Sequence, residues 1–382
     1  MKKVYFDNAA TTQVRNEVVE IISEVLATDY GNPSSTHSFG RSSKSVLENC
    51  RKEIAAHFKV TAAEIIFTSG GTEADNLILN SCIRDLRVEQ ILISKIEHHA
   101  VLHTVESLAS EFDLQIDFVN LDSKGMVDYD HLETLLKSSK KKTLVSLMHV
   151  NNEIGNKLNL KLVADLCQEY KALFHSDTVQ SVGHFELDFS KIPIDFAAVS
   201  AHKFHGPKGV GFAFIRKNSG LKPLIIGGEQ ERGLRAGTEA VYAIAGLTKA
   251  LEISYRDLEK EAAYIKGIKD YFKERLKQEI PSVKFNGYCD DNEKSTYTLL
   301  NVLLPISSEK ATLLLFQLDL RGIACSKGSA CQSGAVGGSH VLAEILSEEE
   351  MQFPSIRFSF SSYNTSEEVD YVIGVLKEFV GY

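Results

Sequence analysis

Short apolar runs alternate with amphipathic segments from about residue 60 to residue 216. The apolar runs predict seven strands, at residues 65–68, 90–94, 114–120, 143–149, 173–176, 196–200 and 210–215. The amphipathic segments predict helices at residues 72–86, 100–112 and 160–170. Alternation of this kind is typical of an α/β fold, in which helices flank a mainly parallel sheet that is buried on both faces.

The pattern changes after about residue 241. A long charged helix at about 243–278 is followed by a strand, a helix, a second strand and a last helix, with the middle three at 297–304, about 308–320 and 356–360. The last helix has Thr365 and Glu368 at the spacing of a capping box. We therefore expect a smaller α+β domain, formed by residues 1–15 and 257–382, beside a large domain of residues 16–256.

The composition narrows the classes of function. The net charge of −9 disfavours nucleic acids and anionic membranes as the main partners, and no apolar stretch is long enough to span a bilayer. Asp7 and Asn8 interrupt the start of the chain, so we expect no signal peptide. Without an export signal, the six cysteines are expected to be reduced thiols in the cytoplasm.

Two polar clusters follow predicted strands of the sheet. Lys203 comes just after the strand at 196–200, where a lysine is costly unless it is paired or chemically used. One such use is a Schiff base with the aldehyde of pyridoxal phosphate, and the commoner alternative is an exposed surface lysine. Asp177 follows the strand at 173–176 and could hold the protonated pyridine nitrogen of that cofactor, or could simply cap a helix. Ligands bind at the carboxyl ends of strands in such sheets, which favours the pair as a site.

The glycine turn at Gly70 and Gly71 suits a phosphate group. It joins the strand at 65–68 to the helix at 72–86, where free backbone N–H groups and the helix dipole attract anions. Neither the Walker spacing nor the dinucleotide-binding Gly-x-Gly-x-x-Gly spacing is present. The alternative is an ordinary helix cap by Thr72.

The cysteines differ in their surroundings. Cys50, Cys82 and Cys167 lie on apolar helix faces and are expected in the core, whereas Cys289 lies in a polar turn without an assigned role. Cys331 lies in a glycine- and serine-rich segment, at about 325–340, that we predict to be a mobile loop on the small domain. A thiol placed there can attack and then move away.

Nearby Lys327 would favour the thiolate of Cys331. Three alternatives remain for this cysteine: an incidental exposed thiol, a disulfide with Cys325, and a metal site shared with Cys325 and His340. The spacing matches no common set of metal ligands, so we expect no metal.

Nine segments together resemble the cysteine desulfurases that supply sulfur for iron–sulfur clusters and tRNA thiolation. The segments run nearly end to end and read DNAATT (7–12), GNPSS (31–35), EHHA (97–100), HVNNEIG (149–155), DTVQSVG (177–183), SAHK (200–203), RGLRAGT (232–238), GSAC (328–331) and SIRFS (355–359). The resemblance implies the fold type I of pyridoxal-phosphate enzymes, in the class V aminotransferase family, with a seven-stranded sheet in the large domain.

The resemblance also assigns roles in cofactor binding. It implies that Lys203 carries pyridoxal phosphate and moves the proton on the substrate Cα, and that His98 stacks on the ring and takes part in proton transfer. Asp177 faces the pyridine nitrogen and Gln180 the phenolic oxygen, with Asn152 nearby. Four residues are implied to hold the phosphate: Gly71, Thr72, Ser200 and His202. Thr238 reaches the phosphate of a partner subunit, which implies a homodimer.

The same resemblance implies the reaction. Arg357 would bind the substrate carboxylate as a bidentate fork, with Asn152 beside the substrate. The Cys331 thiolate would attack the sulfur of L-cysteine and keep it as a persulfide, leaving alanine. The sulfur would then pass to acceptor proteins, either a cluster scaffold or a tRNA-thiolation relay. The alternatives are a selenocysteine lyase, a small-substrate aminotransferase, and a non-catalytic binding protein on the same fold.

Overall fold

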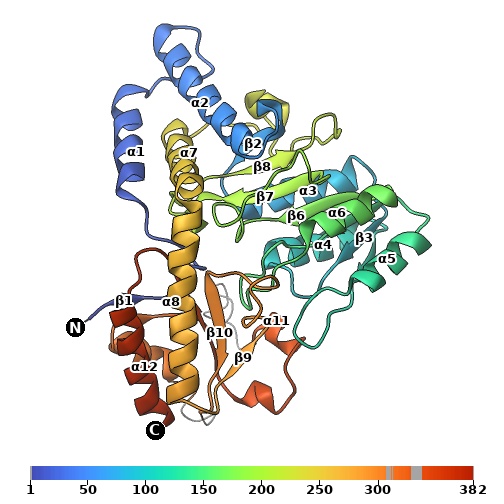
Figure 1. Ribbon diagram of the computed structural model, residues 1–382. Helices are drawn as coiled ribbons and strands as arrows, with labels where there is room; N and C mark the ends of the chain where they lie inside the picture. Colours follow the sequence, from blue (N-terminus) through green and yellow to red (C-terminus); the bar gives the residue numbers. More distant parts are fainter. Residues whose placement is uncertain (1, 307–310, 312, 328–337, 382) are drawn as a thin grey trace.

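The computed structural model describes residues 2–306, 311, 313–327 and 338–381 (Figure 1). At its centre lies a seven-stranded sheet in which every strand except β8 runs in the same direction. In spatial order its strands are β2 (Ile65–Thr68), β8 (Gly211–Ile215), β7 (Phe196–Ser200), β6 (Leu173–Asp177), β5 (Thr143–Ser146), β3 (Gln90–Ile93) and β4 (Gln115–Phe118). The predicted α/β fold with a mainly parallel seven-stranded sheet is therefore confirmed.

Helices cover both faces of this sheet, as its buried strands require. Side chains of α3 (Gly71–Arg84) and α4 (His99–Glu111) form an apolar cluster with one face. The cluster on the other face includes side chains from α1 (Asn16–Thr28), α2 (Ser38–His57), α5 (Tyr129–Ser138), α6 (Leu160–Glu169) and α7 (Val241–Arg256). Three short 3-10 turns complete this part: η1 (Ala62–Glu64), η2 (Ala201–Lys203) and η3 (Gln230–Gly233).

A third apolar cluster joins the two ends of the chain. Val4 and Phe6 pack in it with side chains from residues 265–376, and the ring of Phe6 meets Phe272 and Phe360 edge to face. Around this cluster lie β1 (Val4–Tyr5), α8 (Leu258–Glu279), β9 (Lys284–Asn286), β10 (Leu299–Leu303), α10 (Leu314–Leu320), β11 (Ile323–Ala324), β12 (Ser355–Ser359) and α12 (Ser366–Val380). The division into residues 16–256 and residues 1–15 with 257–382 stays a prediction.

Two further sheets contribute side chains to this third cluster. Strands β12, β10 and β9 form an antiparallel sheet in that order, and β1 pairs in parallel with β11. The remaining elements are α11 (His340–Ala343) and the 3-10 turn η5 (Glu350–Gln352). Thr365 and Glu368 make both bonds of the predicted capping box at the start of α12. In the described part of the chain, no helix is both long and apolar enough to cross a bilayer.

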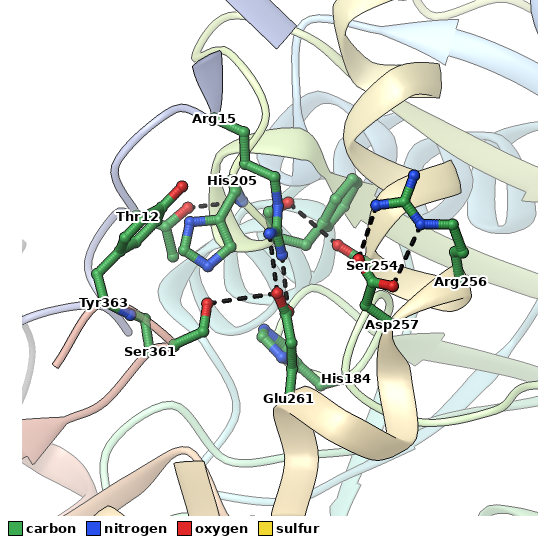
Figure 2. Close-up of polar contacts among 12 residues, drawn as sticks. Thr12, Arg15, His184, His205, Ser254, Arg256, Asp257, Glu261, Ser361 and Tyr363 are labelled. Carbon is green, nitrogen blue, oxygen red and sulfur yellow. Dashed lines mark hydrogen bonds and ion pairs between the residues drawn. The ribbon is translucent and has the colours of Figure 1, made fainter. Parts of the chain in front are cut away.

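The N-terminal segment binds the loop after Lys203 to the small domain (Figure 2). Thr12 N donates to His202 O at 2.9 Å, and His205 N donates to Thr12 Oγ1 at 2.7 Å. Arg15 forms a bidentate pair with Glu261 of α8, with N–O distances of 2.8 and 2.7 Å. Lys203 therefore lies between an apolar cluster of the central sheet and the third apolar cluster.

The prediction for the long helix was wrong. The predicted single helix at 243–278 is two helices, because the chain leaves helical geometry at Asp257, between α7 and α8, which Figure 1 shows end to end. Cys289 lies in a turn, as predicted, and is 2% exposed. The prediction that Cys50, Cys82 and Cys167 lie in the core is confirmed. Much of the predicted loop at 325–340, including Cys331, lies outside the described residues.

Candidate active site

A cavity of about 230 Å³ opens at the carboxyl ends of the parallel strands. Ten of the twelve predicted site residues line it: Gly71, Thr72, His98, Asn152, Asp177, Gln180, Ser200, His202, Lys203 and Arg357. They come from both parts of the chain and are up to 286 positions apart, since 357 − 71 = 286. The structure therefore brings together residues that the sequence separates widely.

Lys203 lies on η2, immediately after the buried strand β7. Its Nζ donates to the carbonyl oxygens of Ala9 and Ala10 at 2.7 and 2.8 Å. These two carbonyls belong to the N-terminal segment and also line the cavity. The amino group thus lies at the cavity wall, where it can reach a ligand.

Asp177 ends strand β6, is buried and lines the cavity. Its Oδ1 accepts a hydrogen bond from Val179 N at 2.9 Å. Burial raises the pKa of Asp177 to about 6, against the lowering effects of that hydrogen bond and of the Lys203 charge. A buried carboxylate of this kind gains stability from a cationic ring nitrogen, so the residue fits the predicted cofactor.

The turn before α3 fits a phosphate group. Helix α3 begins at Gly71, and no side chain caps it, so Thr72 is not the helix cap considered above. Gly70 has φ +151°, and a Cβ on Gly71 would lie 2.5 Å from Val179 Cγ2, which explains both glycines. The start of α3 therefore lines the same cavity as Ser200 and His202, and no side chain of the cap residue accepts from its first-turn N–H groups.

His98 occupies the N-cap of α4. Its Nδ1 accepts from Ala100 N at 3.1 Å, so the neutral ring carries its proton on Nε2. Burial, together with the charge of Lys203, lowers the pKa of His98 to about 4. The side chain is therefore a neutral imidazole at the cavity wall, able to stack on a planar ring and to exchange a proton.

Arg357 lies on β12 and is 1% exposed. Its Nη1 donates to Asn152 O at 2.7 Å and its Nη2 to Asp7 Oδ1 at 3.0 Å. Within the described residues, its buried Nε has no hydrogen-bond partner. A fixed guanidinium with an unused donor is suited to a carboxylate.

Other residues of the cavity were not predicted. They are Ala9, Ala10, Asp75, His99, Met148, Glu153, Val179 and His340. His99 and His340 have their ring centroids 4.5 Å apart, and His340 Nε2 lies 2.9 Å from Glu97 O. The motif EHHA was the available signal for His99, whereas Ala9 and Ala10 act through their backbone. Thr238 is exposed and lies outside the cavity lining, and Cys331 lies outside the described residues.

The pH dependence of stability tests the burial of His149, whose backbone N–H donates to Asp177 O at 3.0 Å. Burial, with the charge of Lys157, lowers the pKa of His149 to about 3. The unfolded chain takes up that proton below about pH 6.5, but the native chain does not, so the free energy of unfolding falls as the pH falls toward 3. His149→Gln should flatten this fall by up to about 1.4 kcal/mol per pH unit. Urea unfolding between pH 7 and pH 5 measures it, and parallel slopes for the two proteins would contradict it.

Comparison with known proteins assigns the chain to a family. The family model for aminotransferase class V matches residues 4–372. The chain belongs to this family. Among its relatives, the cysteine desulfurase IscS of Dictyoglomus turgidum is 39% identical over 99% of this chain and 95% of that protein. The putative cysteine desulfurase IscS 1 of Bacillus subtilis is 41% identical over 97% of this chain and 96% of that protein.

Solved structures of NifS-like proteins share the fold. A NifS-like protein superposes with a TM-score of 0.90 at 34% identity and covers the whole of both chains. The NifS-like protein of Rickettsia africae gives a TM-score of 0.87 at 31% identity, again over both whole chains. The predicted family resemblance is therefore confirmed, and with it the dependence on pyridoxal phosphate.

Proposed function

We propose that this chain is a pyridoxal-phosphate-dependent cysteine desulfurase, which releases alanine from L-cysteine and takes the sulfur onto Cys331. The observation that carries the proposal is the single cavity that gathers Lys203, Asp177 and Arg357, beside an uncapped helix start at Gly71. When bound, pyridoxal phosphate withdraws electrons from the bonds to the substrate Cα. Its ring nitrogen would lie at Asp177 and its phosphate at Gly71, Thr72, Ser200 and His202. Its phenolic oxygen would lie at Gln180, near Asn152.

Each of these cavity residues has its own role in the proposed reaction. Arg357 binds the substrate carboxylate, and its bonds to Asn152 O and Asp7 hold the guanidinium in place. Lys203 binds the cofactor covalently and, once displaced by substrate, moves a proton at Cα. His98 exchanges protons as a neutral imidazole. Because Asp177 is buried, water does not compete with the ring nitrogen for its carboxylate.

The sulfur step balances without an outside oxidant. The Cys331 thiolate attacks the sulfur of cysteine, so an S–S bond forms and the C–S bond breaks. The proton from the thiol is taken up at the substrate Cβ, which gives the methyl group of alanine. The products are therefore alanine and a persulfide, which acceptor proteins of a cluster scaffold or a tRNA-thiolation relay would consume.

We also propose a cytoplasmic homodimer. Thr238 is exposed and does not line its own cavity, which is the arrangement expected of a residue that serves a second subunit. Ile226, on the same loop as Thr238, is 88% exposed and would be covered by such a partner.

Product analysis tests the proposed reaction. The purified protein, saturated with pyridoxal phosphate, should convert L-cysteine to equal amounts of alanine and sulfide when a thiol reductant removes the persulfide. Selenocysteine is tested in parallel. 3-Mercaptopyruvate formed only with a keto-acid acceptor, and without sulfide, would instead identify an aminotransferase. Turnover of selenocysteine alone would identify a selenocysteine lyase.

A further inference from the structure

The loop at residues 226–238, which carries Thr238, has an unfavourable backbone conformation. Within η3, Glu231 has φ 46° and ψ 44°, and Arg232 has φ 59° and ψ 28°. Two consecutive residues other than glycine rarely adopt this left-handed geometry, and they keep it only where surrounding contacts impose it. The loop is therefore held in one shape by other parts of the chain.

A buried ion pair supplies the first of these contacts. Arg51 and Glu231 have side chains that are 2% and 1% exposed, and they bind through two N–O contacts of 2.7 and 2.8 Å. Arg51 also donates to Ile65 O, and Glu231 accepts from Phe67 N, each at 2.7 Å. Both partners are thus bonded to β2, the strand that leads into the proposed phosphate turn.

A second ion pair repeats this arrangement at the turn itself. Arg235 Nε lies 2.9 Å from Glu73 Oε1, and the other oxygen of Glu73 accepts from Ser69 N at 2.8 Å. Glu73 follows Thr72 in the first turn of α3. Each carboxylate therefore binds one backbone N–H of the strand and turn on one side and one arginine on the other.

We propose that these four residues, Arg51, Glu231, Glu73 and Arg235, are positioning residues that link the two cofactor sites of a homodimer. The proposal rests on the proposed function, because it needs Thr238 to reach the cofactor phosphate of a second copy of this chain. A phosphate that orders the turn at residues 68–73 then also fixes the loop that serves the other subunit. Because such coupling is reciprocal, cofactor in either site strengthens binding in the other.

Mixed dimers separate the two directions of this link. Two differently tagged chains are produced together, and one carries Lys203→Ala so that only its partner retains covalently bound cofactor. Arg235→Gln is placed either on the Lys203→Ala chain, where it acts only across the interface, or on the chain that retains Lys203. The rate of cofactor loss is followed by visible absorbance against a dimer without Arg235→Gln.

We expect both mixed dimers to lose the cofactor roughly fivefold faster or more than the reference dimer. Glu229→Gln is the matched control, because this exposed residue lies on the same loop and its side chain does not cap η3, whereas Arg232 pairs with Glu48, which also binds Arg51. It should leave the rate unchanged. Glu231→Gln should act like Arg235→Gln, and its unfolding temperature, measured without cofactor, reports any general loss of stability.

Two results would overturn the proposal. The first is an effect confined to the dimer in which Arg235→Gln and Lys203 share a chain, since the loop would then act on its own subunit only. The second is failure of the two tagged chains to purify together, which would exclude the homodimer as well. The product analysis with L-cysteine does not depend on either result, so it tests the desulfurase reaction separately.

Discussion

A Lys203→Ala protein is expected to lose the visible absorption of bound cofactor and to form alanine from cysteine roughly 10⁴-fold more slowly or worse. The amino group is the one lysine nitrogen among the described cavity residues, and it lies 2.7 and 2.8 Å from the carbonyls of Ala9 and Ala10. Its removal takes away both the covalent attachment and the group that moves the Cα proton. Alanine formation and absorbance spectra measure the two losses together.

Lys208→Ala provides the matched control for this loss. Lys208 is exposed, five positions further along the same loop, and does not line the cavity. It should retain the absorbance and the rate of the unchanged protein. A Lys203→Ala protein that keeps its absorbance and forms alanine at the native rate would show that another group attaches the cofactor.

Cys331→Ala is expected to keep the cofactor absorbance but to lose persulfide formation and almost all sulfide release. The reason is chemical: a thiolate must attack the substrate sulfur, and alanine offers no nucleophile. Sulfide release and absorbance, measured on the same sample, test the two parts of this expectation.

Cys325→Ala is the control for the nucleophile. Burial raises the pKa of the Cys325 thiol, and Asp7 raises it further, so this cysteine is a poor source of thiolate. Its replacement should leave most of the sulfide release intact. Native sulfide release by Cys331→Ala, with loss in Cys325→Ala, would move the nucleophile to Cys325.

Most of the fold could be predicted from the alternation of apolar runs with amphipathic segments. This pattern predicted β2 and β7 with their observed bounds, because a short apolar run between helices can form few structures other than a buried strand. It did not separate α7 from α8, because Asp257 interrupts the helix without the glycine or proline that would mark a break. Helices α1 and α2 were not predicted, since they precede the alternating region.

The site was predictable where function depends on residue type and place. Asp177 ends strand β6 and Lys203 follows strand β7. The carboxyl ends of these two strands meet at one edge of the sheet. The contacts of Lys203 with Ala9 and Ala10 could not be predicted, because backbone carbonyls about 190 positions away carry no signal of residue type. The pair of Arg51 with Glu231 was missed for a similar reason, since the two lie 180 positions apart.

Mass spectrometry after incubation with L-cysteine tests the central claim most directly. The cofactor-saturated protein is mixed with L-cysteine without a thiol reductant, alkylated, digested and searched for a mass gain of one sulfur atom. We predict that the gain lies on the peptide that contains Cys331, and that it is absent when Lys203 is replaced by alanine. Release of alanine with no added sulfur on the Cys331 peptide would contradict the account.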